Sequence, residues 1–276
     1  MMSAKQPHIL VFDSGVGGLS IVEAIKKINP YCQLTYASDN AQFPYGTKSA
    51  SELTTRVEKV LKRLQEKVLA DIIVIACNSA STLVLPTIRS NFLQPIIGVV
   101  PAIKPAAKIT ANNVVGLLAT PGTIHRDYTK KLIKDFASHC KIISIGSSEL
   151  VILAERKLQG KSVSLEVLSE IVAPFHRTKN ACRPDTIVLA CTHFPLLKDE
   201  LMSVLPHTIH WIDSGDAIGR RIEFWIKELK LNAGSLTIGK SSPGHSIFTK
   251  RAEAVELIRP ALIRLGIDYV SYLEVS

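Results

Sequence analysis

The chain has 276 residues, of which 46% are hydrophobic and 21% are charged. This composition excludes disordered, fibrous and low-complexity proteins, and the length fits one large or two smaller domains. A balance of 33 Lys and Arg against 24 Asp and Glu gives a net charge of +9. The basic residues are scattered and not arranged in a stripe with aromatic side chains, so the charge does not require a nucleic-acid partner.

Short apolar runs that end in Gly, Pro, Asp or Ser alternate with stretches of helical periodicity along the chain. This alternation predicts an α/β fold, with mostly parallel sheets covered by helices on both faces. One amphipathic helix is predicted around residues 53–64, where Leu and Val recur on one face. The predicted strands are His8–Phe12, Leu34–Ser38, Ile72–Ala76, Ile96–Val100, Val114–Ala119, Ile142–Ile145, Thr186–Ala190 and His210–Ile212.

No stretch reaches the ~18 to 20 apolar residues that a membrane span needs, and the first apolar run is too short for a signal peptide. We therefore expect a soluble, cytoplasmic protein. The five cysteines are an odd number and are widely spread, without zinc-site spacing. Reduced thiols and no bound metal are the interpretation that this pattern favours.

Two segments of the chain repeat one another. DIIVIACNS at residues 71–79 matches DTIVLACTH at 185–193 in Asp, Ile, Val, Ala and Cys, and residues 12–15 have a looser counterpart at 119–122. We predict two similar domains of Rossmann-like or flavodoxin-like design, formed by residues 1–98 with 208–276 and by residues 99–207. Because ligands bind beyond the carboxyl ends of parallel strands, the active site is expected in the cleft between these domains.

A glycine-rich turn follows the first predicted strand. Gly15-Val-Gly17-Gly-Leu-Ser20 resembles a dinucleotide-binding loop, with Asp39 as the ribose-binding acid, but Ser20 stands where the last glycine is needed. We therefore expect a tight loop that holds an anion such as a carboxylate. Asp13, at the tip of the strand, is either a capping residue or a catalytic one.

Cys77 and Cys191 carry the strongest functional signal. Each follows a predicted strand, precedes polar residues and is expected to precede a helix, whose N-terminus stabilises a thiolate. A single strand-end cysteine is most often a small buried side chain, and this is our interpretation of Cys32, Cys140 and Cys182. The occurrence of two at equivalent positions of a repeat favours chemistry for Cys77 and Cys191.

Two thiols facing opposite sides of one carbon can act as base and acid, which is the logic of a two-base racemase. The carbanion formed from an amino acid then needs hydrogen-bond donors around its carboxylate. Side chains that can supply them are Ser14, Asn78, Ser79 and Thr192. His193 is placed to assist Cys191, and Asp13 to assist Cys77.

Six motifs occur together in an order that resembles the glutamate racemases of the aspartate/glutamate racemase superfamily. They are FDSGVGGLS (12–20), PYGTK (44–48), ACNSA (76–80), ATPGT (119–123), ACTHFPLL (190–197) and IDSG (212–215). The resemblance implies a cofactor-independent enzyme in which Cys77 deprotonates D-glutamate and Cys191 deprotonates L-glutamate, assisted by Asp13, His193 and Glu155. It implies substrate contacts by Asp13, Ser14, Tyr45, Gly46, Asn78, Ser79, Thr192 and His193.

The chain departs from the common family pattern in a few places. Ser79 replaces Thr, and Asp39-Asn40 replaces a Gly-Asp pair. The second departure, together with segments 99–107 and 146–160, is similar to the gammaproteobacterial subgroup. That subgroup includes enzymes activated by a UDP-muramyl peptide precursor, so control by such an activator is a hypothesis here. The implied role is supply of D-glutamate for peptidoglycan, by a monomer or homodimer.

Three alternatives stay open at this point. An aspartate racemase would share the same motifs, because side-chain length is set by the shape of the pocket. A thiol hydrolase would use Cys191 and His193 but would leave Cys77 without a role. A non-catalytic anion-binding protein would use both cysteines for packing only. The tail from Asn232 to Ser276, with a predicted helix at Ala252–Leu265, is assigned no chemistry.

Overall fold

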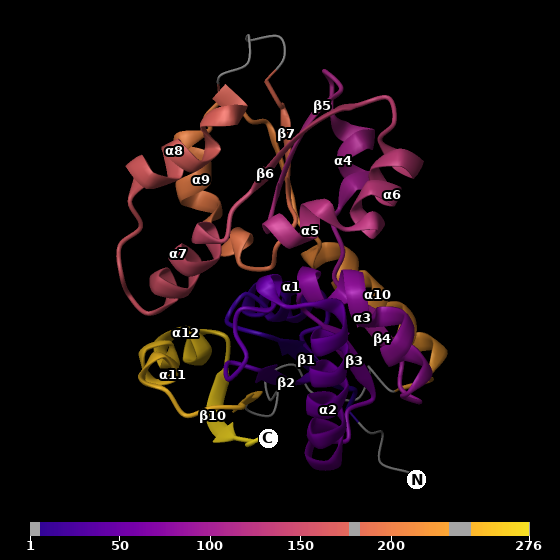
Figure 1. Cartoon of the computed structure of the whole chain (residues 1–276). Coiled ribbons are helices and arrows are strands. Elements are labelled where there is room, and N and C mark those ends of the chain that lie inside the picture. The colour runs from indigo at the N-terminus through magenta and orange to yellow at the C-terminus, as the bar shows by residue number, and fades with distance from the viewer. Residues whose placement is uncertain (1–5, 177–182, 232–243, 276) are drawn as a thin grey trace. The chain divides into compact units, whose positions relative to one another are not determined.

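The computed structural model describes residues 6–176, 183–231 and 244–275. Cys182 lies outside these ranges. The chain forms two compact units, one containing residues up to Val99 and from Gly215 onward, the other Val100–Ser214. Each unit has its own parallel sheet (Figure 1). Within the described ranges, no helix combines the length and apolar character that a membrane crossing requires.

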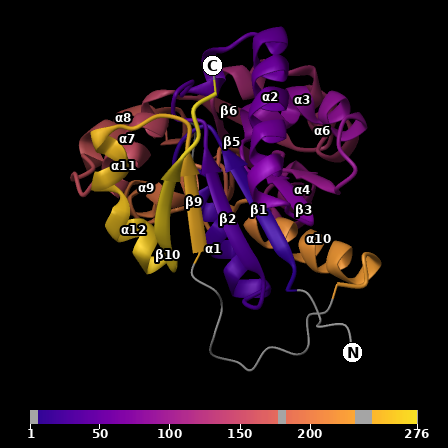
Figure 2. The same ribbon diagram turned by 90° about the horizontal axis from the view of Figure 1, so that it is seen from below.

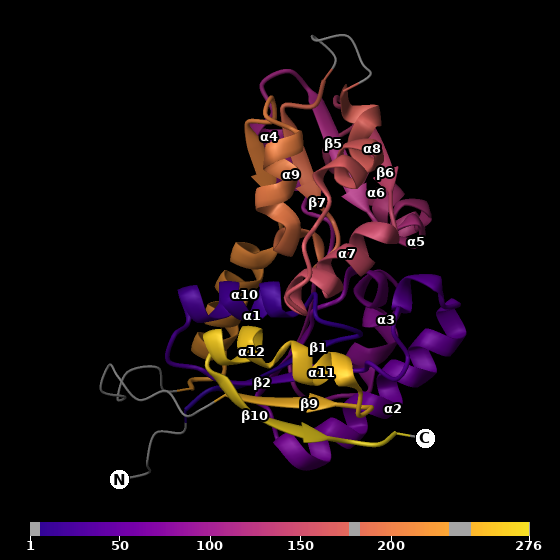
Figure 3. The ribbon, with the colours of Figure 1, turned by 90° about the vertical axis from the view of Figure 1, so that its left-hand side faces the viewer.

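The first unit is built on a six-stranded sheet with the order β10-β9-β2-β1-β3-β4. Helices α1 and α10 pack against each other, as do α2 and α3; Figure 3 shows α1 and α10 on one side of the sheet and α2 on the other. The strands are β1 His8–Asp13, β2 Gln33–Ser38, β3 Ile72–Ile75, β4 Ile96–Gly98, β9 Gly244–Phe248 and β10 Ile267–Tyr272. The helices are α1 Leu19–Ile28, α2 Ala50–Val68, α3 Asn78–Ser90, α10 Gly215–Glu228, α11 Glu253–Leu257 and α12 Arg259–Arg264, with a 3₁₀ turn η1 at Tyr45–Thr47.

Local sequence explains the longest helix of this unit. Ser49 caps α2, because its hydroxyl accepts from the Glu52 amide while the Glu52 carboxylate accepts from the Ser49 amide. The predicted apolar face is confirmed, and all five of its side chains are buried against the core: Leu53, Val57, Val60, Leu61 and Leu64.

The second unit has a four-stranded sheet with the order β6-β5-β7-β8, flanked by α4 and α6 on one side and by α8 and α9 on the other (Figure 1). Its strands are β5 Val114–Ala119, β6 Lys141–Gly146, β7 Thr186–Leu189 and β8 His210–Ile212. Its helices are α4 Ile103–Ile109, α5 Pro121–His125, α6 Asp127–Phe136, α7 Glu149–Leu158, α8 Leu165–His176 and α9 Lys198–Val204, with a 3₁₀ turn η3 at Phe194–Leu197.

The two sheets share one topology, because the order β2-β1-β3-β4 of the first unit reappears as β6-β5-β7-β8 in the second. The two aspartates of the repeat, Asp71 and Asp185, both accept hydrogen bonds from backbone N–H groups near the start of a central strand. Asp71 accepts a hydrogen bond from the backbone N–H of His8 at the start of β1, and Asp185 accepts from the N–H groups of Ala111 and Asn112 just before β5. The predicted α/β fold with two similar parallel-sheet domains is confirmed.

All eight predicted strands are present, with ends that shift by up to two residues. The second crossover between the units lies at Ser214, not near His207 as expected. The reason is that β8 pairs with β7, in register from Thr186 and His210 onward, so residues 210–212 complete the second sheet.

The C-terminal region contains two strands that sequence reasoning missed. β9 pairs with β2 and β10 pairs with β9, so they extend the first sheet at one side (Figure 2). The single helix expected at Ala252–Leu265 is two short helices, α11 and α12, that meet at Ile258. Pro260 lies in the first turn of α12, where its missing N–H is tolerated.

Candidate active site

Asp13 ends β1, the strand next to β3, and its side chain is fully buried. Its carboxylate accepts hydrogen bonds from the backbone N–H groups of Ser14 (2.7 Å) and Gly18 (2.6 Å). Gly18 is required for this closure, since a Cβ there would lie 2.9 Å from the Asp13 Cβ. Asp13 thus closes the glycine-rich loop, and the amides of Ser14 and Gly18 bond to this carboxylate.

Cys77 lies two residues after the end of β3 and occupies the N-cap position of α3, so the predicted helix after this cysteine is confirmed. Asn78 and Ser79 form the first turn of α3 and are buried. The Nδ2 atom of Asn78 is buried and has no hydrogen-bond partner among the described residues. Because a buried donor without an acceptor is costly, this amide is suited to bind an acceptor on a ligand.

Tyr45 begins η1 and is followed by Gly46. Its ring is buried and packs on Phe12, with 6.3 Å between ring centroids, and its hydroxyl donates to Asp39 Oδ2 at 2.6 Å. Burial, reinforced by the Asp39 carboxylate, raises the pKa of Tyr45 well above its ordinary value. The hydroxyl therefore stays a neutral donor at physiological pH.

Cys191, Thr192 and His193 follow β7 in the second unit, and all three are buried. The helix expected directly after Cys191 begins later. A turn and the 3₁₀ segment η3, with Pro195 in its first turn, come first, and the α-helix α9 starts only at Lys198.

His193 lies between a thiol and a carboxylate. Its Nδ1 is 3.8 Å from Cys191 Sγ, and its Nε2 is 2.8 Å from Oε1 of Glu155 on α7. Burial opposes protonation, but the hydrogen bonds and charges of Cys191 and Glu155 outweigh it and raise the pKa of His193 well above its ordinary value. The imidazolium form is therefore favoured, held between two groups that carry negative charge when ionised.

The predicted site residues thus fall into one set in each unit. The first unit holds Asp13, Ser14, Tyr45, Gly46, Cys77, Asn78 and Ser79. The second unit holds Glu155, Cys191, Thr192 and His193.

The other described cysteines have different surroundings. Cys32 is buried, and this burial raises the pKa of its thiol to about 12. Burial also raises the pKa of Cys140. Both thiols are therefore protonated at physiological pH, which agrees with a packing role for them.

Sequence reasoning missed part of the surroundings of Tyr45. The Asp39 carboxylate is engaged by Arg56 and Thr249 as well as by Tyr45, so the ribose-binding role considered for Asp39 does not fit this structure. The only hint of these contacts in the sequence was that Asp39-Asn40 departs from the family pattern. In the part of the chain that the structure describes, no group of three or more His, Cys, Asp or Glu side chains is arranged to hold a metal ion.

Comparison with known proteins places these features in a family. The model of the Asp/Glu/Hydantoin racemase family matches residues 19–221. A glutamate racemase of Salmonella typhimurium is 52% identical over 226 residues, covering 82% of this chain and 79% of the relative. A glutamate racemase of Escherichia fergusonii is 46% identical and covers 99% of this chain and 94% of the relative.

Among solved structures, the chain is similar to an Escherichia coli glutamate racemase described as a complex with L-glutamate and the activator UDP-MurNAc-Ala. The TM-score is 0.90 at 44% identity, and the match covers 99% of this chain and all of that chain.

Proposed function

Since the chain belongs to the Asp/Glu/Hydantoin racemase family, we propose that it interconverts L- and D-glutamate, with Cys77 and Cys191 as the two acid/base groups and without a cofactor. The observation that carries the proposal is the position of these two thiols, which follow equivalent strands of a duplicated fold. The substrate is inferred from the glutamate racemases that resemble the chain.

The proposed reaction exchanges one proton for another at the α-carbon. The Cys191 thiolate takes the α-proton of L-glutamate, and the electron pair left on the α-carbon takes a proton from the Cys77 thiol on the opposite face. The product is D-glutamate, Cys191 becomes a thiol and Cys77 becomes a thiolate. The reverse reaction begins with Cys77 as the base.

Each of the two thiols lies beside a group that attracts negative charge. Cys77 caps the N-terminus of α3, where the helix dipole favours negative charge. Cys191 has the imidazole of His193 beside it, and Glu155 favours the protonated form of that imidazole. In this proposal Asp13 assists Cys77, since Asp13 ends β1 and Cys77 lies two residues beyond the end of the adjacent strand β3.

The remaining residues bind glutamate and stabilise the charge that develops on its carboxylate. In the first unit we assign this role to Ser14, Tyr45, Gly46, Asn78 and Ser79, and in the second unit to Thr192. The buried Nδ2 of Asn78, which has no hydrogen-bond partner in the described part of the chain, supports this assignment most directly. Donors fixed before the reaction need no reorganisation when the charge appears.

The relatives are bacterial proteins, so we propose that this enzyme supplies D-glutamate for peptidoglycan in a bacterial cytoplasm. The similar Escherichia coli enzyme is described with the activator UDP-MurNAc-Ala. We propose that a UDP-muramyl peptide precursor activates this chain as well.

The test is racemisation in heavy water. Protein free of metal and pyridoxal phosphate is incubated with L-glutamate in D₂O, and circular dichroism and α-deuterium are followed together. Early in the reaction D-glutamate should carry deuterium while the remaining L-glutamate keeps its proton, because different thiols serve the two faces. Deuterium appearing equally early in both enantiomers would contradict a two-base mechanism, and L-aspartate as substrate would reveal an aspartate racemase.

Cys77→Ser and Cys191→Ser should each lower the racemisation rate by about 10²- to 10⁴-fold, the range for loss of a general acid or base. Cys140→Ser is the matched control and should keep the activity. Full racemisation by either active-site variant would refute the assignment, and loss of activity only with Cys191→Ser would favour a thiol hydrolase.

A further inference from the structure

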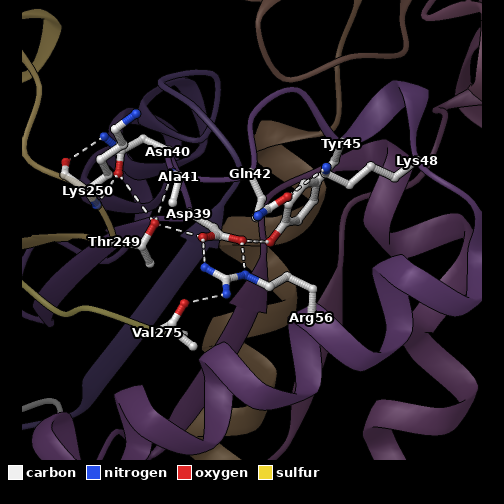
Figure 4. Close-up of polar contacts among 10 residues, drawn as sticks. All are labelled: Asp39, Asn40, Ala41, Gln42, Tyr45, Lys48, Arg56, Thr249, Lys250 and Val275. Carbon is white, nitrogen blue, oxygen red and sulfur yellow. Dashed lines mark hydrogen bonds and ion pairs between the residues drawn. The ribbon is translucent and has the colours of Figure 1, made fainter.

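Asp39 is buried and is the centre of a polar cluster that includes the Tyr45 hydroxyl (Figure 4). Its Oδ2 accepts from the Tyr45 hydroxyl at 2.6 Å and from Arg56 Nε at 2.9 Å. Its Oδ1 accepts from Arg56 Nη2 at 2.8 Å and from the Thr249 hydroxyl at 2.7 Å. Both carboxylate oxygens are therefore engaged by two donors each.

Arg56 fixes the carboxylate from the side of α2. The guanidinium binds Asp39 with two parallel hydrogen bonds, a geometry that sets the plane of the carboxylate as well as its position. Its Nη1 donates to the backbone carbonyl of Val275 at 2.6 Å. Arg56 thus connects α2, the turn after β2 and the segment after β10.

The turn that carries Asp39 is also fastened to the segment after β9. The Ala41 amide donates to the Thr249 hydroxyl at 3.1 Å. Asn40 and Lys250 form a reciprocal pair, in which Asn40 Nδ2 donates to the Lys250 carbonyl at 2.8 Å and the Lys250 amide donates to Asn40 Oδ1 at 2.9 Å. Both members of the unusual Asp39-Asn40 pair therefore contact the C-terminal region.

Tyr45 is held at both ends of its side chain, because its ring packs on Phe12 and its hydroxyl is bound by Asp39. Its backbone continues directly into Gly46. Stability alone does not account for the cluster, since a buried ion pair is often no more stabilising than apolar side chains of similar volume. What such a pair supplies is a fixed geometry for the tyrosine.

We propose that Asp39 is a positioning residue, which, clamped by Arg56 and Thr249, sets the placement of the Tyr45–Gly46 segment for binding the substrate. This inference rests on the proposed function, in which Tyr45 and Gly46 contact glutamate. Asp39 acts through Tyr45 and takes no part in proton transfer. The effect of losing it is accordingly on substrate binding, not on the chemical step.

The first test separates binding from chemistry. Asp39→Asn places an amide N–H₂ where two donors already converge, and Tyr45→Phe removes only the hydroxyl. Each variant should raise KM for both enantiomers by about tenfold, the loss expected for one hydrogen bond to a charged group, with kcat within about twofold of wild type. The double variant should match the single ones, because both remove the same contact.

Glu66→Gln is the matched control. It also converts a carboxylate on an arginine into an amide, since Glu66 pairs with Arg63, but this pair is exposed on α2. The control should leave KM unchanged. If Asp39→Asn does not fold, Tyr45→Phe decides the question alone. Unchanged KM in a folded variant, or an equal rise in the control, would overturn the proposal.

A second readout does not depend on activity. The Lys48 amide donates to the Tyr45 carbonyl at 3.2 Å, so hydrogen exchange of residues 42–48 reports the order of this segment. Exchange should be at least about tenfold faster in Asp39→Asn and Tyr45→Phe than in wild type or Glu66→Gln. If wild-type protein fails to racemise glutamate with UDP-MurNAc-Ala present, the proposed function is refuted, and unchanged exchange would separately refute the positioning role.

Discussion

At the scale of residues, the two thiols that we propose as acid and base have different surroundings. Cys77 sits at the N-terminus of a 13-residue helix, whereas Cys191 has the His193–Glu155 pair and no α-helix directly after it. In the proposed mechanism the helix dipole favours negative charge at Cys77, and the His193–Glu155 pair does so at Cys191. The His193–Glu155 pair, unlike the helix dipole, can be removed by a point substitution.

We predict that Glu155→Gln shifts the pH dependence of racemisation. The carboxylate helps to raise the pKa of His193 above its ordinary value, so its removal lowers that pKa and the imidazolium is lost at lower pH. The alkaline limb of kcat/KM against pH, measured by circular dichroism, should move to lower pH. Glu149→Gln, on an exposed position of α7, is the control. An alkaline limb that stays in place would contradict the role of Glu155.

Site residues were easiest to predict from the sequence where reactive side chains fall within the repeated segments 71–79 and 185–193. The positions of Cys77, Cys191 and the polar residues beside them could be predicted, because each set follows a buried strand within a few residues. The Asp39 cluster could not, since Arg56 and Thr249 are 17 and 210 residues away from Asp39 in the chain. Contacts of that kind depend on the packing of a helix and an added strand, which no local pattern encodes.

At the scale of elements, continuous apolar runs predict strands well where both faces of the sheet are covered. β1, β3, β5 and β7 are buried along almost their whole length and were all found from such runs. β10 was missed because its residues Ile267–Tyr272 alternate with polar side chains and are mostly exposed or half-buried. Strands at the side of a sheet keep fewer of the signals on which the prediction depends.

We predict that Asp185→Asn weakens the second unit. Burial opposes ionisation of Asp185, but hydrogen bonds from Thr110, Thr186, Ala111 and Asn112 lower its pKa below the ordinary value of an aspartate. A lowered pKa in the folded state contributes stability above that value, which is lost as the pH falls through the folded-state pKa. The free energy of unfolding in urea should be about 1–3 kcal/mol lower for the variant at pH 7.

This deficit should shrink as the pH is lowered below about 4. Asp127→Asn, whose side chain is exposed on α6, is the control and should match wild type at every pH. A deficit that is the same at all pH values would show that charge on Asp185 is not the cause.

At the scale of the whole molecule, the proposed function includes activation of racemisation by a UDP-muramyl peptide precursor. We predict that UDP-MurNAc-Ala raises kcat/KM for glutamate by about 5- to 150-fold, the usual range of allosteric coupling. Thermodynamic linkage requires glutamate to tighten activator binding by the same factor as the activator tightens glutamate binding. Titration calorimetry with each ligand, alone and in the presence of the other, checks this reciprocity. UDP alone is the control, and full turnover without the activator would contradict the prediction.

The first sheet continues beyond β2 into β9 and β10, whereas the second ends at β6 in the described structure, and this difference affects which substitutions each unit tolerates. β2 lies between β1 and β9 and is buried along its length except at Gln33, whereas its counterpart β6 ends its sheet in the described structure and exposes Lys141, Ser144 and Gly146. Polar substitutions should therefore be accepted at many positions of β6 and at few of β2. The sequence likeness between the halves is correspondingly seen at β3 and β7, each of which lies between two other strands, and not at β2 and β6.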